Sequence, residues 1–213
     1  MMDFYWADPH FNDEGMIVKN ERPFSSVNEM DEYYIDRINS KVGERDRLWI
    51  LGDFCNGANK EVEKYRRLIR CSQVCLITGN HDKVGPNNKI FAITKDLYDY
   101  HFKDDYVSQF IVMCHYPMKS WNKLWYGSWC LHGHSHGFVH PKHEFQLDIG
   151  VDCFPDGPLS FYEIYEIMRQ KRIDWLRHHG PLCNKGLPDW AREEELQEAF
   201  KFLRKKNDFT ISY

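Results

Sequence analysis

Short apolar runs and helical patterns alternate along the first 150 residues, and each apolar run ends at polar residues. The runs cover residues 4–7, 48–52, 74–79, 110–114 and 128–131. Their short length and their aromatic and branched apolar side chains predict strands. Ligands gather outside the carboxyl ends of strands in sheets flanked by helices. The polar residues that directly follow each run (the polar stops) therefore predict one converging site in an α/β fold.

Three segments with helical spacing have recognisable start signals. Ser26 and Glu29 form a capping-box pair, and Asn59 is the expected N-cap of the next helix. Ser160 and Glu163 form a second capping-box pair, although the apolar residues that follow also fit a strand. We expect the first of these helices to cover a face of the predicted sheet.

The chain is expected to form a single domain over residues 1–213, because its 42% hydrophobic composition can supply a sizeable core. Residues 160–213 are predicted to be a mainly helical C-terminal extension, with Asp189 capping the last helix. Residues 180–188 contain two prolines and two glycines, which is typical of a linker.

Composition and charge exclude several classes of partner. The chain carries 28 Lys and Arg against 32 Asp and Glu, a formal net charge of −4, so a long nucleic acid is disfavoured. No apolar run reaches the roughly 20 residues needed to cross a bilayer, and the first residues lack a signal-peptide pattern. Seven irregularly spaced cysteines fit reduced thiols. We therefore expect a cytoplasmic protein without a membrane partner, and its oligomeric state stays open.

The polar stops offer the ligands of a dinuclear hydrolytic metal site. Such a site takes about three or four protein ligands per ion plus one shared group, and the two oxygens of Asp53 could provide that group. Glycines directly precede three of the stops, as expected where the backbone turns sharply and ions approach closely. These glycines are Gly52, Gly79 and Gly133. The candidate ligands are Asp8, His10, Asp53, Asn80, His115, His134 and His136.

The ordered motifs around these ligands resemble those of calcineurin-like metallophosphoesterases. They are Asp8-X-His10, Gly52-Asp53, Gly79-Asn80-His81-Asp82, His115 and Gly133-His134-Ser135-His136. The flanking residues 22–24, 115–117, 131–137 and 148–152 further resemble small bacterial and phage phosphoesterases of unassigned substrate. The resemblance implies two packed mixed β-sheets flanked by helices, as a four-layer sandwich.

The same resemblance implies two divalent ions and assigns their ligands. One ion would be held by Asp8, His10, Asp53 and His136, and the other by Asp53, Asn80, His115 and His134. The mixed oxygen and nitrogen set suits manganese, iron or zinc, of which we favour manganese. Two such ions can share a hydroxide and lower its pKa, so that it attacks a phosphorus atom in line.

His81 is the residue that the resemblance identifies as the general acid for the leaving group. We advance the hypothesis that Asp82 orients its ring. Related protein phosphatases carry Asp-Arg-Gly after the bridging aspartate and Glu after Asn-His, whereas this chain has Gly52-Asp53-Phe54-Cys55-Asn56-Gly57 and Asn80-His81-Asp82. A phosphodiester or nucleotide-like substrate is therefore favoured over a phosphoprotein.

Four residues outside the ligand set are candidates for substrate binding. Arg22, Tyr116 and Lys119 could hold phosphate oxygens, and His132 could contact substrate or fill its own loop. The aromatic and basic stretch 116–126 could form a rim that stacks a base or sugar, or it could pack as an ordinary lid.

Asp148 and Asp152, which follow the last motif, are expected to have a structural role.

The alternative function is a catalytically idle metal-binding interaction module on the same scaffold. The presence of His81 beside a full ligand set disfavours that alternative.

Overall fold

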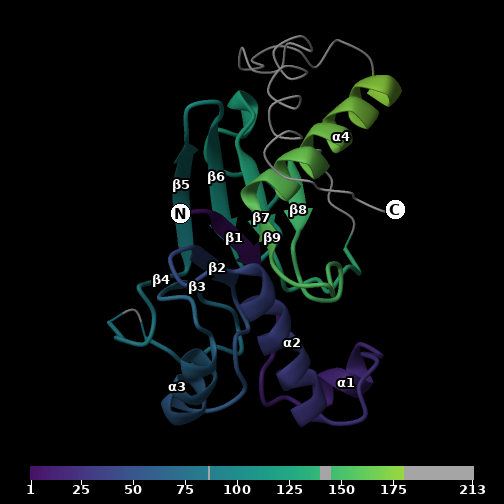
Figure 1. The fold of residues 1–213 in the computed structure, drawn as a ribbon. Helices are drawn as coiled ribbons and strands as arrows, with labels where there is room; N and C mark the ends of the chain where they lie inside the picture. Colours follow the sequence, from purple (N-terminus) through teal and green to yellow (C-terminus); the bar gives the residue numbers. More distant parts are fainter. Residues whose placement is uncertain (86, 140–144, 180–213) are drawn as a thin grey trace.

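Two mixed β-sheets with flanking helices form the fold, as predicted (Figure 1). The structure, a computed structural model, describes residues 1–85, 87–139 and 145–179, with side chains up to residue 172 in the last helix. The first sheet has the order β4-β3-β2-β1-β9, with β1 (Asp3–Trp6), β2 (Arg47–Leu51), β3 (Gln73–Ile77), β4 (Ile93–Lys95) and β9 (Leu159–Ser160). The second has the order β5-β6-β7-β8, with β5 (Leu97–Lys103), β6 (Ser108–Cys114), β7 (Trp129–His132) and β8 (Gln146–Asp148).

Strand direction brings the polar stops to common edges of the sheets. In the first sheet β1 to β4 run parallel, and β9 pairs antiparallel with β1. In the second sheet β6, β7 and β8 run parallel, and β5 is antiparallel to β6. The apolar runs of the sequence correspond to β1, β2, β3, β6 and β7. Because parallel neighbours end at the same edge, the residues that follow them lie side by side.

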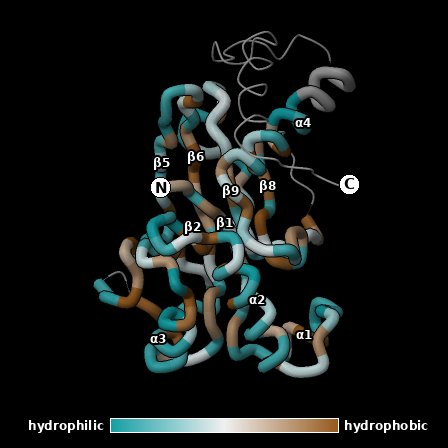
Figure 2. Tube along the Cα trace, viewed as in Figure 1, coloured by the Kyte–Doolittle hydropathy of each residue, from teal (hydrophilic) through white to brown (hydrophobic). Residues whose placement is uncertain are grey.

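The first sheet is buried on both faces. On one face, Trp6 and Ile50 pack with side chains of α2 (Val27–Lys41) and α3 (Asn59–Leu68). On the other face, Tyr5 and Trp49 pack against the second sheet and the start of α4 (Phe161–His179). Strands covered on both faces are apolar at nearly every position. Figure 2 shows brown along β6 of the second sheet, whereas β5 is largely teal. The helices are α1 (Gly15–Lys19), α2 (Val27–Lys41), α3 (Asn59–Leu68) and α4 (Phe161–His179), with a 3₁₀ turn η1 (Leu124–Tyr126).

Two helix starts differ locally from the prediction. The hydroxyl of Ser26 accepts the N–H of Glu29 at the start of α2, as a cap should. The Glu29 carboxylate, however, accepts from the N–H and hydroxyl of Ser25 rather than from Ser26. Asn59 is the first residue of α3 and not its N-cap, because Ala58 has the extended backbone of that position.

The capping box at Ser160 and Glu163 forms both of its hydrogen bonds and begins α4. The alternative that residues 161–168 form a strand is therefore wrong, because they lie in α4. The predicted cap Asp189 and the linker-like residues 180–188 lie outside the described residues, as does the end of the expected extension 160–213. No helix in the described ranges is long and apolar enough to cross a membrane.

Candidate metal centre

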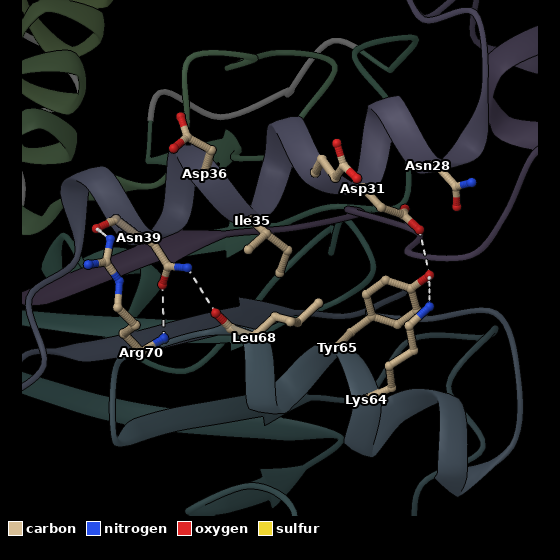
Figure 3. Close-up of a pocket in the computed structure, with 10 residues that line it drawn as sticks. Asn28, Asp31, Ile35, Asp36, Asn39, Lys64, Tyr65, Leu68 and Arg70 are labelled. Atoms are coloured by element: carbon tan, nitrogen blue, oxygen red, sulfur yellow. Dashed lines mark hydrogen bonds between the residues drawn. The ribbon is translucent and has the colours of Figure 1, made fainter.

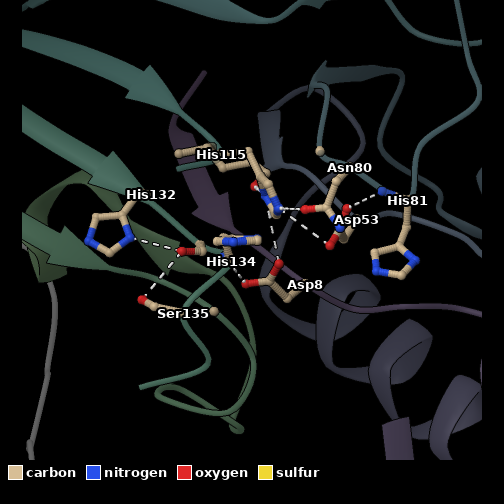
Figure 4. A network of polar contacts seen from close by, with 12 residues as sticks. Asp8, Asp53, Asn80, His81, His115, His132, His134 and Ser135 are labelled. Carbon is tan, nitrogen blue, oxygen red and sulfur yellow. Dashed lines mark hydrogen bonds and ion pairs between the residues drawn. The ribbon is translucent and has the colours of Figure 1, made fainter. Parts of the chain in front are cut away.

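The loops after β1, β2, β3, β6 and β7 bring the predicted ligands together. Figure 4 shows the side chains of Asp8, Asp53, Asn80, His115 and His134 gathered in one place, between segments that are far apart in the sequence. Asp8, His10, Asp53 and His115 are almost fully buried. Buried groups of this polarity need partners, because desolvation otherwise costs several kcal/mol, on the order of 2–7 for a neutral group.

One cluster consists of Asp8, His10 and His136. Each offers one ligand atom, and these atoms lie within 4.8 Å of one another. Asp8 Oδ1 and both ring nitrogens of His10 are buried without a hydrogen-bond partner, which is rare for buried polar atoms. A divalent cation among these side chains would give Asp8 and His10 the partner that they lack, so the residues fit a metal ion.

The second cluster consists of Asp53, His115 and His134, again with ligand atoms within 4.8 Å of one another. In the neutral ring, His115 Nδ1 carries the proton, because it donates to the carbonyl oxygen of Leu51 at 2.8 Å. The unprotonated Nε2 lies 3.2 Å from Asn80 Oδ1 and 3.3 Å from Asp53 Oδ2. These three atoms all carry lone pairs, and in the neutral ring no proton lies between them. Their arrangement therefore fits a bound cation.

Asp53 stands between the two clusters. Its Oδ2 lies 3.4 Å from His10 Nε2 and 3.3 Å from His115 Nε2, while its Oδ1 accepts the N–H of His81 at 2.8 Å. Burial raises the pKa of Asp53, but the imidazoles of His10 and His115 outweigh it and hold that pKa well below the usual range. Burial raises the pKa of Asp8 to about 7. A divalent ion would therefore compete with a proton at Asp8.

A left-handed backbone is concentrated at the predicted ligands. Non-glycine residues adopt a positive φ in only a few per cent of cases, and each such residue costs on the order of 1–3 kcal/mol. Among the described residues only three other non-glycine positions have it: Asn12, Glu21 and Lys123. The ligands that have it are Asp8 (φ 57°), His10 (51°), Asp53 (52°), His134 (65°) and His136 (46°). Strain of this kind persists where the surrounding structure fixes a functional geometry.

Glycines let the ligand loops approach one another closely, as predicted. A Cβ on Gly79 would lie 2.3 Å from Asp53 Oδ1, and a Cβ on Gly133 would lie 2.4 Å from Asp8 Oδ2. Both distances are far below van der Waals contact. Side chains at these positions would push apart the loops that carry the two aspartates.

A sequence model described as calcineurin-like phosphoesterase matches residues 7–211, a range that contains both clusters. The chain belongs to this family. Membership implies that this phosphoesterase is a metal-dependent hydrolase of phosphoesters, and its two clusters can hold metal ions.

Two further proteins are similar to this chain, and the name of neither states a substrate. An uncharacterized protein of Methanocaldococcus jannaschii is 27% identical over 176 residues, which cover 78% of this chain and 91% of that protein. The crystal structure of a protein of unknown function from Aquifex aeolicus matches with a TM-score of 0.60 and 22% identity. That match covers 78% of this chain and 98% of the other, and it shows the fold alone.

Asp82 has a different place from the one predicted. The hypothesis was that it orients the ring of His81, its neighbour. Its two carboxylate oxygens instead accept three backbone N–H groups, at 2.8–2.9 Å, from Asp53, Phe54 and Gly79. Asp82 therefore ties the loop after β2 to the loop after β3, and the side chain of His81 stays exposed at the site.

Arg22 also differs from its expected role in phosphate binding. Its side chain is buried, with 5% of the residue exposed. All five N–H directions of the guanidinium have acceptors in the protein, so none is left for a phosphate oxygen. The acceptors are both carboxylate oxygens of Asp152, the carbonyls of Asp8 and Pro9, and the sulfur of Met30.

The other three substrate-binding candidates divide into one buried and two exposed residues. His132 is fully buried, its Nδ1 pairs with the carbonyl of Gly133 at 2.9 Å, and Figure 4 shows its ring directed away from Asp8. Contact with substrate is therefore excluded for His132 in this conformation. Tyr116 and Lys119 are exposed, and the Tyr116 ring centroid lies 4.8 Å from that of His134.

The stretch 116–126 serves partly as core. Trp121 and Leu124 are buried in the cluster between the sheets, as expected of ordinary lid packing. Trp125 and Tyr126, in contrast, are 78% and 73% exposed. Tyr116, at the start of this stretch, contacts the predicted ligands through the rings of His115 and His134.

A groove of about 510 Å³ lies between α2 and α3 (Figure 3). Its polar side chains pair with one another across the two helices: Tyr65 donates to Asp31 at 2.6 Å, and Asn39 donates to the carbonyl of Leu68 at 2.8 Å. These bonds hold α2 against α3. The predicted metal ligands are absent from the described residues that line the groove.

Three acids at the site have contacts that the sequence did not reveal. Asp152 lies 2.6 Å from His136 Nδ1, and Asp148 accepts the hydroxyl of Ser135 at 2.7 Å, so both support the loop after β7. Asp13 lies with His10 and His81 in a third group whose ligand atoms are within 4.8 Å of one another. The sequence predicted a structural role for Asp148 and Asp152 but not their partners, and it did not single out Asp13, which follows His10 by three residues.

Proposed function

We propose that this phosphoesterase is a dinuclear metal-dependent phosphodiesterase. One ion would be held by Asp8, His10, Asp53 and His136, and the other by Asp53, Asn80, His115 and His134. The observation that carries the proposal is the position of Asp53 Oδ2, 3.4 Å from a His10 nitrogen and 3.3 Å from a His115 nitrogen. One carboxylate this close to the imidazoles of both clusters supports a ligand shared by two ions.

Two divalent ions at this place would supply a nucleophile from water near neutral pH and neutralise charge on the phosphate oxygens. Carboxylate, amide and imidazole ligands together suit manganese, iron or zinc, and manganese is the ion we favour. The protein's own part is to hold these ligands in place. The hydrogen bonds of Asp82 and the left-handed backbones of the ligand loops support such preorganisation.

His81 is the general acid in this proposal. Its peptide N–H is fixed on Asp53 Oδ1 at 2.8 Å, and its exposed ring lies with its centroid 5.1 Å from that of His10. A ring nitrogen of His81 donates its proton to the leaving oxygen as the P–O bond breaks, so an alcohol leaves instead of an alkoxide. The exposed Tyr116 and Lys119 are the proposed donors to the non-bridging phosphate oxygens.

The proposed substrate is a small phosphodiester or a nucleotide-like phosphate. The chain lacks the residues that follow the bridging aspartate and the Asn-His pair in protein phosphatases. Its net charge of −4 disfavours a long nucleic acid. The described cysteines are free thiols, which supports a cytoplasmic location as part of the proposal.

The test is a chelation and add-back assay on bis-(p-nitrophenyl) phosphate and on the monoester p-nitrophenyl phosphate. Chelation should abolish turnover and Mn²⁺ should restore it, with the diester hydrolysed faster than the monoester. Asp53→Asn, which keeps the shape of the side chain but removes its charge, is the control for contaminating phosphatases. Folded, metal-loaded protein without turnover of either compound would favour the idle metal-binding module. Faster hydrolysis of the monoester would overturn the diester preference.

A further inference from the structure

An ion pair between the buried Arg22 and the partly buried Asp152 lies directly behind one of the two clusters. Asp152 Oδ2 is 2.6 Å from His136 Nδ1 and also accepts from Arg22 at 2.8 Å and from Asn20 at 3.1 Å. The second oxygen, Oδ1, accepts from Arg22 at 2.9 Å. An ionised carboxylate can only accept hydrogen bonds, so His136 carries its proton on Nδ1. In the neutral ring the other nitrogen, Nε2, is then the unprotonated one and is able to bind an ion.

The same guanidinium also holds the loop that carries the other two ligands of this cluster. Arg22 donates to the carbonyl oxygen of Asp8 at 2.9 Å and to that of Pro9 at 3.2 Å. Asp8 and His10 both have left-handed backbones, which need such support. A single buried side chain thus connects the loop after β1 with the loop after β7.

The second cluster has a different support. There the ring of His115 donates from Nδ1 to the neutral carbonyl of Leu51 at 2.8 Å. A carboxylate behind a histidine ligand orients the ring and strengthens it as a ligand, and losing such a partner typically lowers metal affinity 10- to 100-fold. The two clusters should therefore respond differently when Asp152 is changed.

We infer that Arg22 and Asp152 are positioning residues for the ion at Asp8, His10 and His136, and that they leave the ion at Asp53, His115 and His134 unaffected. This inference rests on the proposed dinuclear site and goes beyond it, because it makes the two metal positions unequal. Arg22 and Asp152 act through His136 and through the backbone of the loop after β1. Neither needs to contact the substrate.

The test is titration of the metal-free protein with Mn²⁺ against a competing chelator, with bound metal counted by elemental analysis. Wild-type protein should bind two ions. Asp152→Asn and Arg22→Met should weaken one ion about 10- to 100-fold and leave the other unchanged. Arg22→Lys, which keeps the charge without the paired N–H groups, should lie between. Glu63→Gln, which removes an exposed ion pair with Arg67, is the matched control and should bind as wild type does.

Each outcome decides the inference separately from the proposed function. Wild-type protein that binds fewer than two ions would refute the dinuclear site itself. The positioning role would be overturned if wild-type protein binds two ions and Asp152→Asn binds both of them equally well. It would also be overturned if Asp152→Asn weakens both ions equally. Thermal unfolding of the metal-free variants checks folding. Should Asp152→Asn not fold, Arg22→Lys gives the same contrast, and unchanged binding in that variant overturns the inference.

Discussion

Gly79→Ala is the most direct test of whether the loops after β2 and β3 must touch. The added Cβ would lie 2.3 Å from Asp53 Oδ1 and 2.6 Å from the backbone nitrogen of Asp53, whereas ordinary contact begins at 3.4 Å. One loop would have to move by about 1 Å, and a displacement of that size at a reacting centre costs about 10²-fold in rate. Overpacking of this kind also destabilises by about 1–3 kcal/mol. We expect a rate loss of about two orders of magnitude with weaker metal binding.

Gly85→Ala is the matched control in the segment that follows β3. A Cβ on Gly85 would meet nothing within 4 Å, and this glycine does not have a positive φ. The same substitution should leave turnover unchanged and stabilise by about 0.4–1 kcal/mol, because alanine restricts the unfolded chain. The assay is metal-restored hydrolysis of bis-(p-nitrophenyl) phosphate alongside denaturant unfolding of both variants. Wild-type turnover in Gly79→Ala, or an equal loss in Gly85→Ala, would refute the reasoning.

Three further predictions concern a proton donor, a loop connection and the effect of pH. His81→Asn should keep both ions but slow turnover by about 10² or more, most strongly for substrates with poor leaving groups. Loss of an ion in elemental analysis would instead show that His81 is a metal ligand. Asp82→Ala leaves three backbone N–H groups without acceptors. It should therefore lower the free energy of unfolding of the metal-free protein by about 1–3 kcal/mol. Unchanged stability in denaturant unfolding would contradict the connecting role of Asp82. Because burial raises the pKa of Asp8 to about 7, the metal-free protein holds a proton there at lower pH, and an ion must displace it. Metal affinity should therefore fall as pH drops below 7. Calorimetry in buffers of different ionisation heat should show that metal binding releases a proton. Metal affinity that does not depend on pH would contradict the competition between the ion and the proton at Asp8.

The strands and the positions of the metal candidates were accessible from the sequence because they follow simple rules. Each strand is a short apolar run, and the residues after parallel strands meet at one edge. Gly79 and Gly133 were identified by the same logic, since a ligand that follows a glycine signals a close approach of backbones. The capping signals at Ser26 and Ser160 also located two helix starts correctly.

The partners of individual side chains could not be predicted, because they depend on which loops meet. Asp82 follows His81 in the sequence, yet its oxygens face backbone N–H groups of another loop. Arg22 and Asp152 are 130 residues apart and pair behind the site. His132 is one residue after Leu131, and successive strand residues point to opposite faces, so its nearness to the motif did not place it at the site.

Seven side chains from far-apart loops are proposed to form two adjoining cation sites that share Asp53. Anomalous diffraction from crystals grown with Mn²⁺ tests it most directly. We expect two peaks about 3.5–4 Å apart, one at each cluster, with Asp53 between them. A single peak, or two peaks remote from Asp53, would contradict it.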